Sequence, residues 1–155
     1  MELQFVNEDN ADLISLSGAL DAFYFDRFGE QYLPYLPHNK LTGLAGSAVA
    51  YKDGTPCGCV CWKAFDAVTA ELKRMFVRDD CRRQGIARAL VEAVEAHAAA
   101  SGCHRMVLET AVETPEAVAF YRAIGYTVLK EGFGPYIGDA DCVCFEKEIS
   151  DGTMR

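Results

Sequence analysis

The chain is short of basic residues and histidine, and each shortage narrows the range of functions. Its 15 lysines and arginines face 23 aspartates and glutamates, a formal net charge of −8 at pH 7. Phosphate backbones attract basic surfaces, so general nucleic-acid binding is not expected. Only three histidines are present and no two cysteines have the Cys-x-x-Cys spacing, so we expect no metal site.

Neither a basic segment nor a long apolar stretch opens the chain. We therefore expect no signal peptide and no membrane contact, and a reducing cytoplasm as the location. The seven cysteines are odd in number and lack the spacing of a secreted disulfide scaffold, which favours buried free thiols. Cys57, Cys59 and Cys61 alternate, as do Cys142 and Cys144, so each set is predicted to share one face of a strand.

Length and composition indicate one globular domain over residues 1–155. Half of the 155 residues are apolar and a quarter are charged, which is ordinary usage for a folded domain. Helical patterns come first, followed by antiparallel strands joined at an Asp-Gly turn, and then by strand, helix, strand, helix and two strands. This order predicts an α+β or mixed α/β fold.

The negative charge is unevenly distributed along the chain. Residues 73–88 contain six basic and two acidic side chains, a local balance of +4 that leaves −12 for the remainder. A cationic segment in an acidic protein suggests a small anionic ligand. The acidic remainder favours a cationic or amine-bearing partner through long-range attraction.

The cationic segment joins a strand to a long helix through a short polar turn. Gly85 removes the Cβ that would hold a ligand away, and the free amides at the start of the helix can bind an anion. Arg82, Arg83 and Arg88 add positive charge there. The alternative to an anion site is a capped helix whose arginines face the solvent. The phosphate motifs of P-loop enzymes and dinucleotide-binding proteins are absent, so neither nucleotide hydrolysis nor hydride transfer is favoured.

Two motifs follow one another between residues 75 and 126. The first is Met75-Phe76-Val77 followed by Arg82-Arg83-Gln84-Gly85-Ile86-Ala87, and the second is Ala117-x-x-Phe120-Tyr121-x-x-Ile124-Gly125-Tyr126. The first resembles motif A of the GNAT superfamily of acyl-CoA-dependent N-acetyltransferases, Arg/Gln-x-x-Gly-x-Gly/Ala, and the second resembles the family's Ala-x-x-Leu-Tyr-x-x-Leu-Gly-Phe. The resemblance covers about residues 46–129. It implies a mixed, mostly antiparallel sheet of six to seven strands, splayed in the middle and flanked by about four helices.

By that resemblance, the chain moves an acetyl group from acetyl-CoA to a primary amine by direct attack, without a metal. The pyrophosphate is expected on the amides of residues 83–88 and the pantetheine arm along the backbone of residues 75–77. The acceptor would be a small-molecule or peptide amine, and family members often form homodimers. The implied cofactor-binding residues are Met75, Phe76, Val77, Arg82, Arg83, Gln84, Gly85, Ile86, Ala87 and Arg88.

Two side chains are candidates for proton transfer. Tyr121 matches the family tyrosine that protonates the departing thiolate, although without the motif it would be interpreted as a half-buried helix tyrosine. Glu71 matches a strand position where some members place a general base; an exposed carboxylate paired with a nearby lysine or arginine is an equal alternative. Thr114 stands where the family often has asparagine, and the sequence is compatible with a simple helix cap there.

Two functions of other classes stay compatible with the sequence. One is a catalytically silent acyl-CoA-binding or regulatory module, and the other is an interaction domain whose arginines form a solvated face. The aromatic-rich residues 23–36 fit either core packing or an acceptor pocket. Residues 23–35 and the loop over residues 132–141 are the expected places for acceptor selection.

Overall fold

The computed structural model describes residues 1–149, which form one seven-stranded sheet. The strand order is β1-β2-β3-β4-β5-β7-β6, and only β4 and β5 are parallel neighbours. This confirms the expected α+β fold with a mostly antiparallel sheet. The strands are β1 (Glu2–Phe5), β2 (Gly46–Lys52), β3 (Thr55–Ala64), β4 (Thr69–Val77), β5 (Arg105–Ala111), β6 (Thr127–Val128) and β7 (Cys142–Glu148).

Three α-helices flank the sheet in the described part of the chain, one fewer than the approximate number expected. Asn10 begins the first of them by accepting hydrogen bonds from two backbone amides, each at 3.0 Å. A 3-10 segment with two internal prolines follows it, because proline cannot donate the hydrogen bond that an α-helix needs. The helices are α1 (Ala11–Phe28), α2 (Ile86–Ala100) and α3 (Pro115–Ala123), and the 3-10 segments are η1 (Gly29–Asn39), η2 (Asp79–Cys81) and η3 (Gly134–Tyr136).

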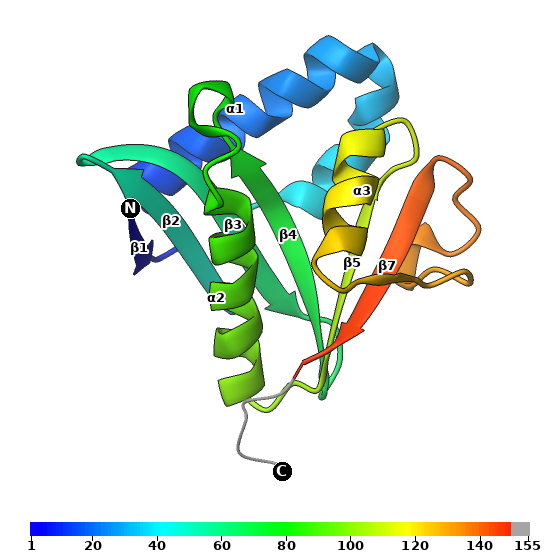
Figure 1. The fold of residues 1–155 in the computed structure, drawn as a ribbon. Coiled ribbons are helices and arrows are strands. Elements are labelled where there is room, and N and C mark those ends of the chain that lie inside the picture. Colours follow the sequence, from blue (N-terminus) through cyan, green and yellow to red (C-terminus); the bar gives the residue numbers. More distant parts are fainter. Residues whose placement is uncertain (150–155) are drawn as a thin grey trace.

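The helices cover opposite faces of the sheet (Figure 1). On one face, the predicted apolar stripe of α2 is buried together with residues of α3 in the main core. On the other face, Leu13 and Leu16 of α1 pack against Val49, Cys59 and Cys61. No helix within residues 1–149 is long and apolar enough to cross a membrane.

The cysteines of β3 do not share one face, which corrects the expectation from their alternation. A register shift in the β2–β3 pairing places an extra residue at Cys57, between the pairs formed by Pro56 and Gly58. Such a bulge reverses the side-chain direction locally. Cys57 therefore lies in the core beneath α2, whereas Cys59 and Cys61 lie beneath α1.

The centre of the sheet is splayed, as the resemblance implied. The parallel pairing of β4 and β5 extends over only three residue pairs and ends at Glu71 and Val107. Beyond this point the two strands diverge toward the ends that face α1, and Figure 1 shows the widening gap between them. The last six residues of β4 thus have a strand partner on one side only, namely β3.

Candidate active site

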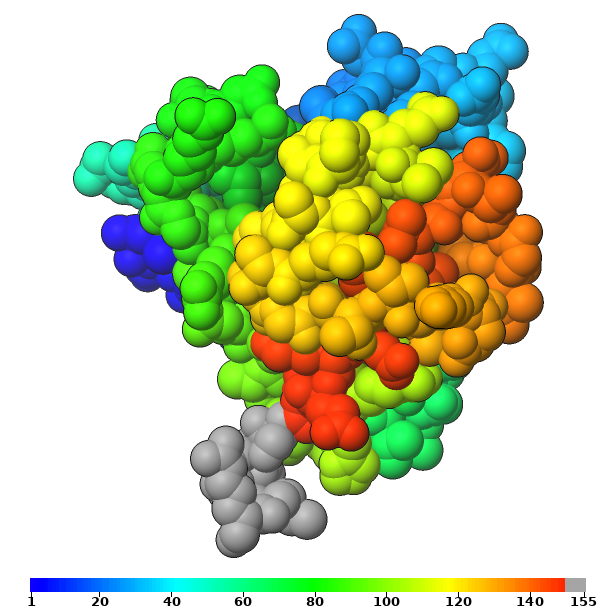
Figure 2. All heavy atoms as spheres, turned by 45° about the vertical axis from the view of Figure 1, so that its right-hand side comes forward, coloured from blue at the N-terminus to red at the C-terminus, as the bar shows by residue number. Residues whose placement is uncertain are grey.

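A cavity of about 520 Å³ occupies the splayed centre of the sheet. Its walls come from β4 and β5, from α1 and η1 on one side, and from the β4–α2 turn and α3 on the other. Ligands in open sheets commonly bind where neighbouring strands separate, so this is the natural candidate site. In Figure 2 the surface is notched between the green lobe of the β4–α2 turn and the yellow surface of α3.

The β4–α2 turn has the backbone shape that the sequence predicted. Gly85 precedes α2 with a φ of +78°, and no atom lies within 4 Å of the position that a Cβ would occupy. The first helical hydrogen bond runs from the Ala89 amide to the Gly85 carbonyl, so the three amides before Ala89 have no partner within the helix. The turn therefore presents free donors beside open space, as an anion site requires.

The cationic segment does not form one surface patch, which corrects the expectation from its charge balance. Lys73 and Arg74 are buried, and each is paired with a carboxylate inside the protein. Two of the exposed arginines of the segment also have acidic partners: Arg82 lies 2.7 Å from Asp79, and Arg88 lies 2.8 Å from Glu92. Arg83 is exposed, lines the cavity and has no ion-pair partner among residues 1–149. The turn thus offers one uncommitted arginine.

The remaining predicted cofactor-binding residues separate into two groups. Met75, Phe76, Val77, Arg82, Arg83 and Ala87 line the cavity. The other residues do not: the side chain of Ile86 is buried in the core, Gln84 accepts a hydrogen bond from Lys52, and Arg88 points to Glu92 on the outer face of α2. Only the backbone of these residues and of Gly85 is available to the cavity side of the turn.

Tyr121 of α3 reaches the cavity from the core. Its side chain is buried, and its ring packs against Phe120, Tyr126 and Phe145 with centroids 5.1 to 6.2 Å apart. Within residues 1–149 its hydroxyl makes no hydrogen bond, although the residue lines the cavity. Burial raises the pKa of Tyr121 above its usual value, so the phenol stays protonated at neutral pH.

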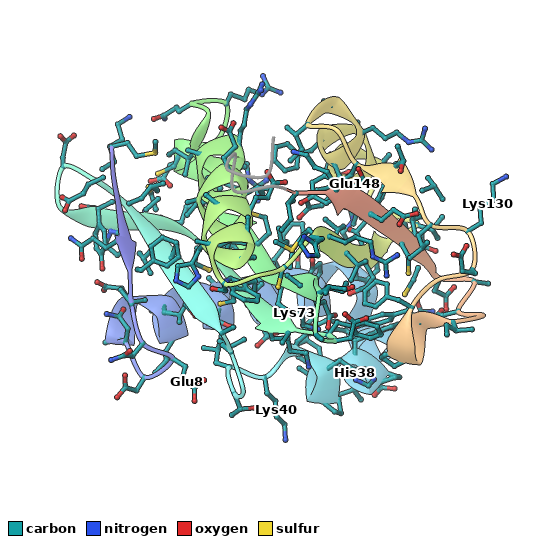
Figure 3. The ribbon with its side chains drawn as sticks, turned by 90° about the horizontal axis from the view of Figure 1, so that it is seen from below. Glu8, His38, Lys40, Lys73, Lys130 and Glu148 are labelled. Atoms are coloured by element: carbon teal, nitrogen blue, oxygen red, sulfur yellow. The ribbon has the colours of Figure 1, made fainter. Side chains whose placement is uncertain are left out.

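Glu71 is buried at the last β4–β5 pair and lines the cavity. Its Oε2 lies 3.3 Å from Nζ of Lys73, whose ammonium also donates to the hydroxyl of Tyr136 at 3.4 Å. The predicted ion pair with a nearby lysine is therefore present, but it is buried rather than exposed. In Figure 3 Lys73 lies within the molecule, whereas Lys40 and Lys130 point outward.

A second carboxylate, Glu109 of β5, also lines the cavity and was not identified from the sequence. Burial raises the pKa of Glu109, while a hydrogen bond with the Cys142 thiol and the charge of Lys73 lower it less. Glu109 has no salt-bridge partner among the described residues. The only sequence signal for it was its position directly after the compact apolar run of residues 106–108, which was predicted to be a strand.

Aromatic side chains of α1 and η1 form the wall opposite the β4–α2 turn. Tyr24, Phe28, Tyr32 and Tyr35 all line the cavity, which supports the acceptor-pocket interpretation of residues 23–36. The loop after β6 contributes Asp141 to the cavity lining, and its Asp139 accepts a hydrogen bond from Tyr35 at 2.8 Å. This half of the cavity is therefore mainly aromatic.

Thr114 does not cap α3 with its side chain, although it occupies the N-cap position. Its hydroxyl instead donates to the carbonyl of Ala111 at 2.6 Å and lies 3.1 Å from the hydroxyl of Thr110. The short β5–α3 turn brings the Ala111 carbonyl closer than the helix amides.

No group of three potential metal ligands is found within residues 1–149.

Comparisons with known proteins agree with this architecture. The family model described as "Acetyltransferase (GNAT) family" matches residues 13–126. A curated protein of Azospirillum brasilense named "IAA acetyltransferase" is 37% identical over 103 residues, which are 65% of this chain and 66% of that protein. The alignment thus spans just under two thirds of that relative.

Two solved structures illustrate the shared fold. A Klebsiella pneumoniae protein assigned as an acyl-CoA N-acyltransferase superposes with a TM-score of 0.79 at 25% identity, covering 96% of this chain and 97% of that one. PaiA N-acetyltransferase of Thermoplasma acidophilum, solved in complex with coenzyme A, superposes with a TM-score of 0.71 at 18% identity, covering 96% and 99%. With the family match over most of its length, the chain belongs to the GNAT family of acetyltransferases.

Proposed function

We propose that the protein transfers an acetyl group from acetyl-CoA to the primary amine of a small acceptor, by direct attack while both are bound. One observation carries this proposal: the unpaired edge of β4, the Tyr121 phenol and the Glu109 carboxylate line the same cavity. An activated acyl donor needs backbone donors, the leaving thiolate needs an acid, and the attacking amine needs a base.

The donor half of the cavity suits coenzyme A. The pyrophosphate would bind to the free amides at the start of α2, with Arg83 as the uncommitted cation. The open space above Gly85 leaves room for the phosphates. The pantetheine arm would lie along residues 75–77 of β4, where β5 has diverged and backbone groups have no strand partner on that side.

Glu109 is the better proton acceptor of the two cavity-lining carboxylates that stand on β4 and β5. Glu71 is already neutralised by Lys73, and removing its charge would leave a buried ammonium without a partner. Within residues 1–149 Glu109 has no such partner, and its raised pKa brings it closer to neutral pH, where a general base is most effective. Glu71 is then a supporting residue that holds Lys73.

The proton balance is simple. The amine enters as an ammonium and gives one proton to Glu109, which returns it to solvent. The nitrogen–carbon bond forms as the carbon–sulfur bond breaks, and Tyr121 donates its proton to the sulfur. The second proton of the nitrogen restores the phenol. The products are the N-acetyl amine and coenzyme A.

The acceptor half favours an amine attached to an apolar or aromatic body. Its walls are aromatic, and both interior cations are occupied: Lys73 by Glu71 and Arg74 by Asp21. An acceptor with a carboxylate or phosphate would find no free counter-ion there. An ammonium, by contrast, would meet Glu109 and several ring faces.

The test is thiol release from acetyl-CoA with a panel of aromatic amines, aliphatic amines, polyamines, aminoglycosides and peptides. We expect turnover with neutral-bodied primary amines, and a loss of about 10²-fold or more in kcat for Glu109→Gln, the usual range for a lost general base. Glu71→Gln should lower kcat less than Glu109→Gln does, and it should not remove the acidic limb of the plot of kcat against pH. Binding of coenzyme A without thiol release across the panel would instead indicate a silent acyl-CoA-binding module.

A further inference from the structure

Arg74 has an unusual backbone for a residue within a strand. Its φ is +58°, in the left-handed region that residues other than glycine rarely adopt. The β3–β4 register explains why: Cys59 faces Phe76 and Cys61 faces Lys73, so two residues of β4 lie opposite the single residue between those cysteines. Arg74 and Met75 therefore form a bulge at the point where the cavity begins.

The Arg74 side chain holds this bulge against α1 and η1. Its guanidinium is 1% exposed. It donates to the hydroxyl and the carbonyl of Ser17 at 3.0 and 2.7 Å, to Oδ1 of Asp21 at 2.8 Å and to the hydroxyl of Tyr32 at 3.2 Å. A strained residue persists only where its surroundings over-determine it, and these four hydrogen bonds supply that constraint.

The same network reaches the aromatic wall of the cavity. The Tyr32 hydroxyl donates to Asp21 at 2.6 Å and accepts from Asn39 at 3.0 Å, so strand, helix and 3-10 segment meet at one cluster. Tyr32 and Asn39 line the cavity on the proposed acceptor side, and Met75 lines it from the bulge. If β4 straightened by one residue, the side chains beyond the shift would exchange faces, and the Arg74 hydrogen bonds would be lost.

We propose that Arg74 is a positioning residue for the transfer: it fixes the backbone at residues 74–77, against which the donor would lie, and ties it to the acceptor wall of α1 and η1. The inference rests on the proposed function for its catalytic consequence. Its structural consequence does not depend on turnover: the bulge and the acceptor wall should lose order together when the guanidinium is removed.

Three variants test the role of the guanidinium. Arg74→Lys keeps the charge but cannot bind three residues with one planar group. Arg74→Gly allows the positive φ but has no side chain to fix it. Tyr32→Phe removes only the link to η1. The control is Tyr51→Phe. It deletes another hydrogen bond to α1, the one of 2.6 Å that the Tyr51 hydroxyl donates to Asp12, and Tyr51 does not line the cavity.

Hydrogen exchange gives the readout that is independent of activity. Amides of residues 72–77 and of η1 should exchange faster in Arg74→Lys and Arg74→Gly, by about tenfold or more, and not in Tyr51→Phe. Tyr32→Phe should accelerate η1 alone. Unchanged exchange in both regions of the Arg74 variants would overturn the proposal, whatever the activity of the protein. Should the Arg74 variants fail to fold, Tyr32→Phe and Ser17→Ala apply the same criterion by removing one hydroxyl of the network at a time.

Kinetics then test the catalytic consequence on an acceptor that the wild-type protein uses. We expect kcat to fall about tenfold or more in Arg74→Lys, while the affinity for coenzyme A changes less than threefold. Folded Arg74 variants with wild-type kcat, or an equal loss in Tyr51→Phe, would refute a positioning role. Absence of turnover in the wild-type protein contradicts the proposed function instead, and leaves the exchange result to decide the structural inference.

Discussion

Nζ of Lys73 lies 3.3 Å from Oε2 of Glu71, and both side chains are only 6% exposed. Burying a charge is costly unless an opposite charge accompanies it, so each residue makes the other tolerable. The pair also explains why a lysine of β4 can line the cavity. Lys73 lies 5.9 Å from the ring centre of Tyr136, close enough for a cation–π contact.

The first prediction concerns the stability that depends on this pair. Lys73→Met leaves the Glu71 carboxylate buried alone and should lower the free energy of unfolding at pH 7 by about 3–5 kcal/mol, the usual cost of breaking a buried pair. Urea denaturation measures it. The double variant Glu71→Gln/Lys73→Met should recover much of the loss. A single variant as stable as the wild type would show that the pair contributes nothing.

The second prediction is a pH dependence of stability caused by Glu109. Because its pKa is raised in the folded protein, the native state binds its proton more tightly than the unfolded state does. The wild type therefore loses stability as pH rises from the unfolded pKa through the folded pKa. Glu109→Gln has no charge to bury and should melt at a higher temperature than the wild type at pH 8.

The difference in melting temperature between Glu109→Gln and wild type should shrink toward zero as pH falls below the ordinary glutamate range. Glu113→Gln is a suitable control, because Glu113 is an exposed carboxylate of the same region. A difference that does not vary with pH would mean that the variant changes packing rather than charge.

Most of the fold could be predicted from local patterns. The alternation of apolar residues, the Asp-Gly turn and the cap residues are properties of short segments, and they located the strands and helices to within a few residues. The motif around Gly85 located the turn, because a free helix start needs only neighbouring residues to form.

Side-chain directions at the site could not be predicted in the same way. Bulges at Cys57 and at Arg74 each shift the alternation of a strand, and a bulge depends on the partner strand rather than on the segment itself. The charge count over residues 73–88 likewise groups Lys73 and Arg74 with the arginines of the turn, although both lie inside the protein. Glu109 was missed because its importance arises from the divergence of β4 and β5, which no local pattern encodes.

The third prediction concerns the Tyr121 phenol. Tyr121→Phe should lower kcat by about 10²-fold or more, the usual range for a lost general acid, and should change coenzyme A affinity less than threefold. Because burial raises the pKa of Tyr121, wild-type activity should show no alkaline limb from this group up to pH 9. Steady-state kinetics and calorimetry with coenzyme A separate the two effects.

A neighbouring tyrosine provides the matched control for Tyr121→Phe. Tyr126 packs against the Tyr121 ring, but its hydroxyl donates to Glu95 at 2.7 Å on the far side from the cavity lining. Tyr126→Phe should therefore reduce stability, because it leaves Glu95 with one fewer hydrogen bond, while kcat is kept. Equal kcat losses in both variants would indicate that Tyr121 acts through packing alone.

The last prediction separates backbone strain from ligand contact at Gly85. Alanine at its φ of +78° is strained by about 1–2 kcal/mol, and its methyl group would enter the space assigned to the pyrophosphate. Gly85→Ala should therefore weaken coenzyme A binding about tenfold beyond its effect on stability. Gly43 is the matched control, with a φ of +68°, open space around its Cβ position and no place in the cavity lining. Gly43→Ala should lower the melting temperature comparably and leave coenzyme A affinity unchanged. If both variants bind coenzyme A like the wild type, the phosphates do not lie on this turn, and the donor would have to enter the cavity from another side.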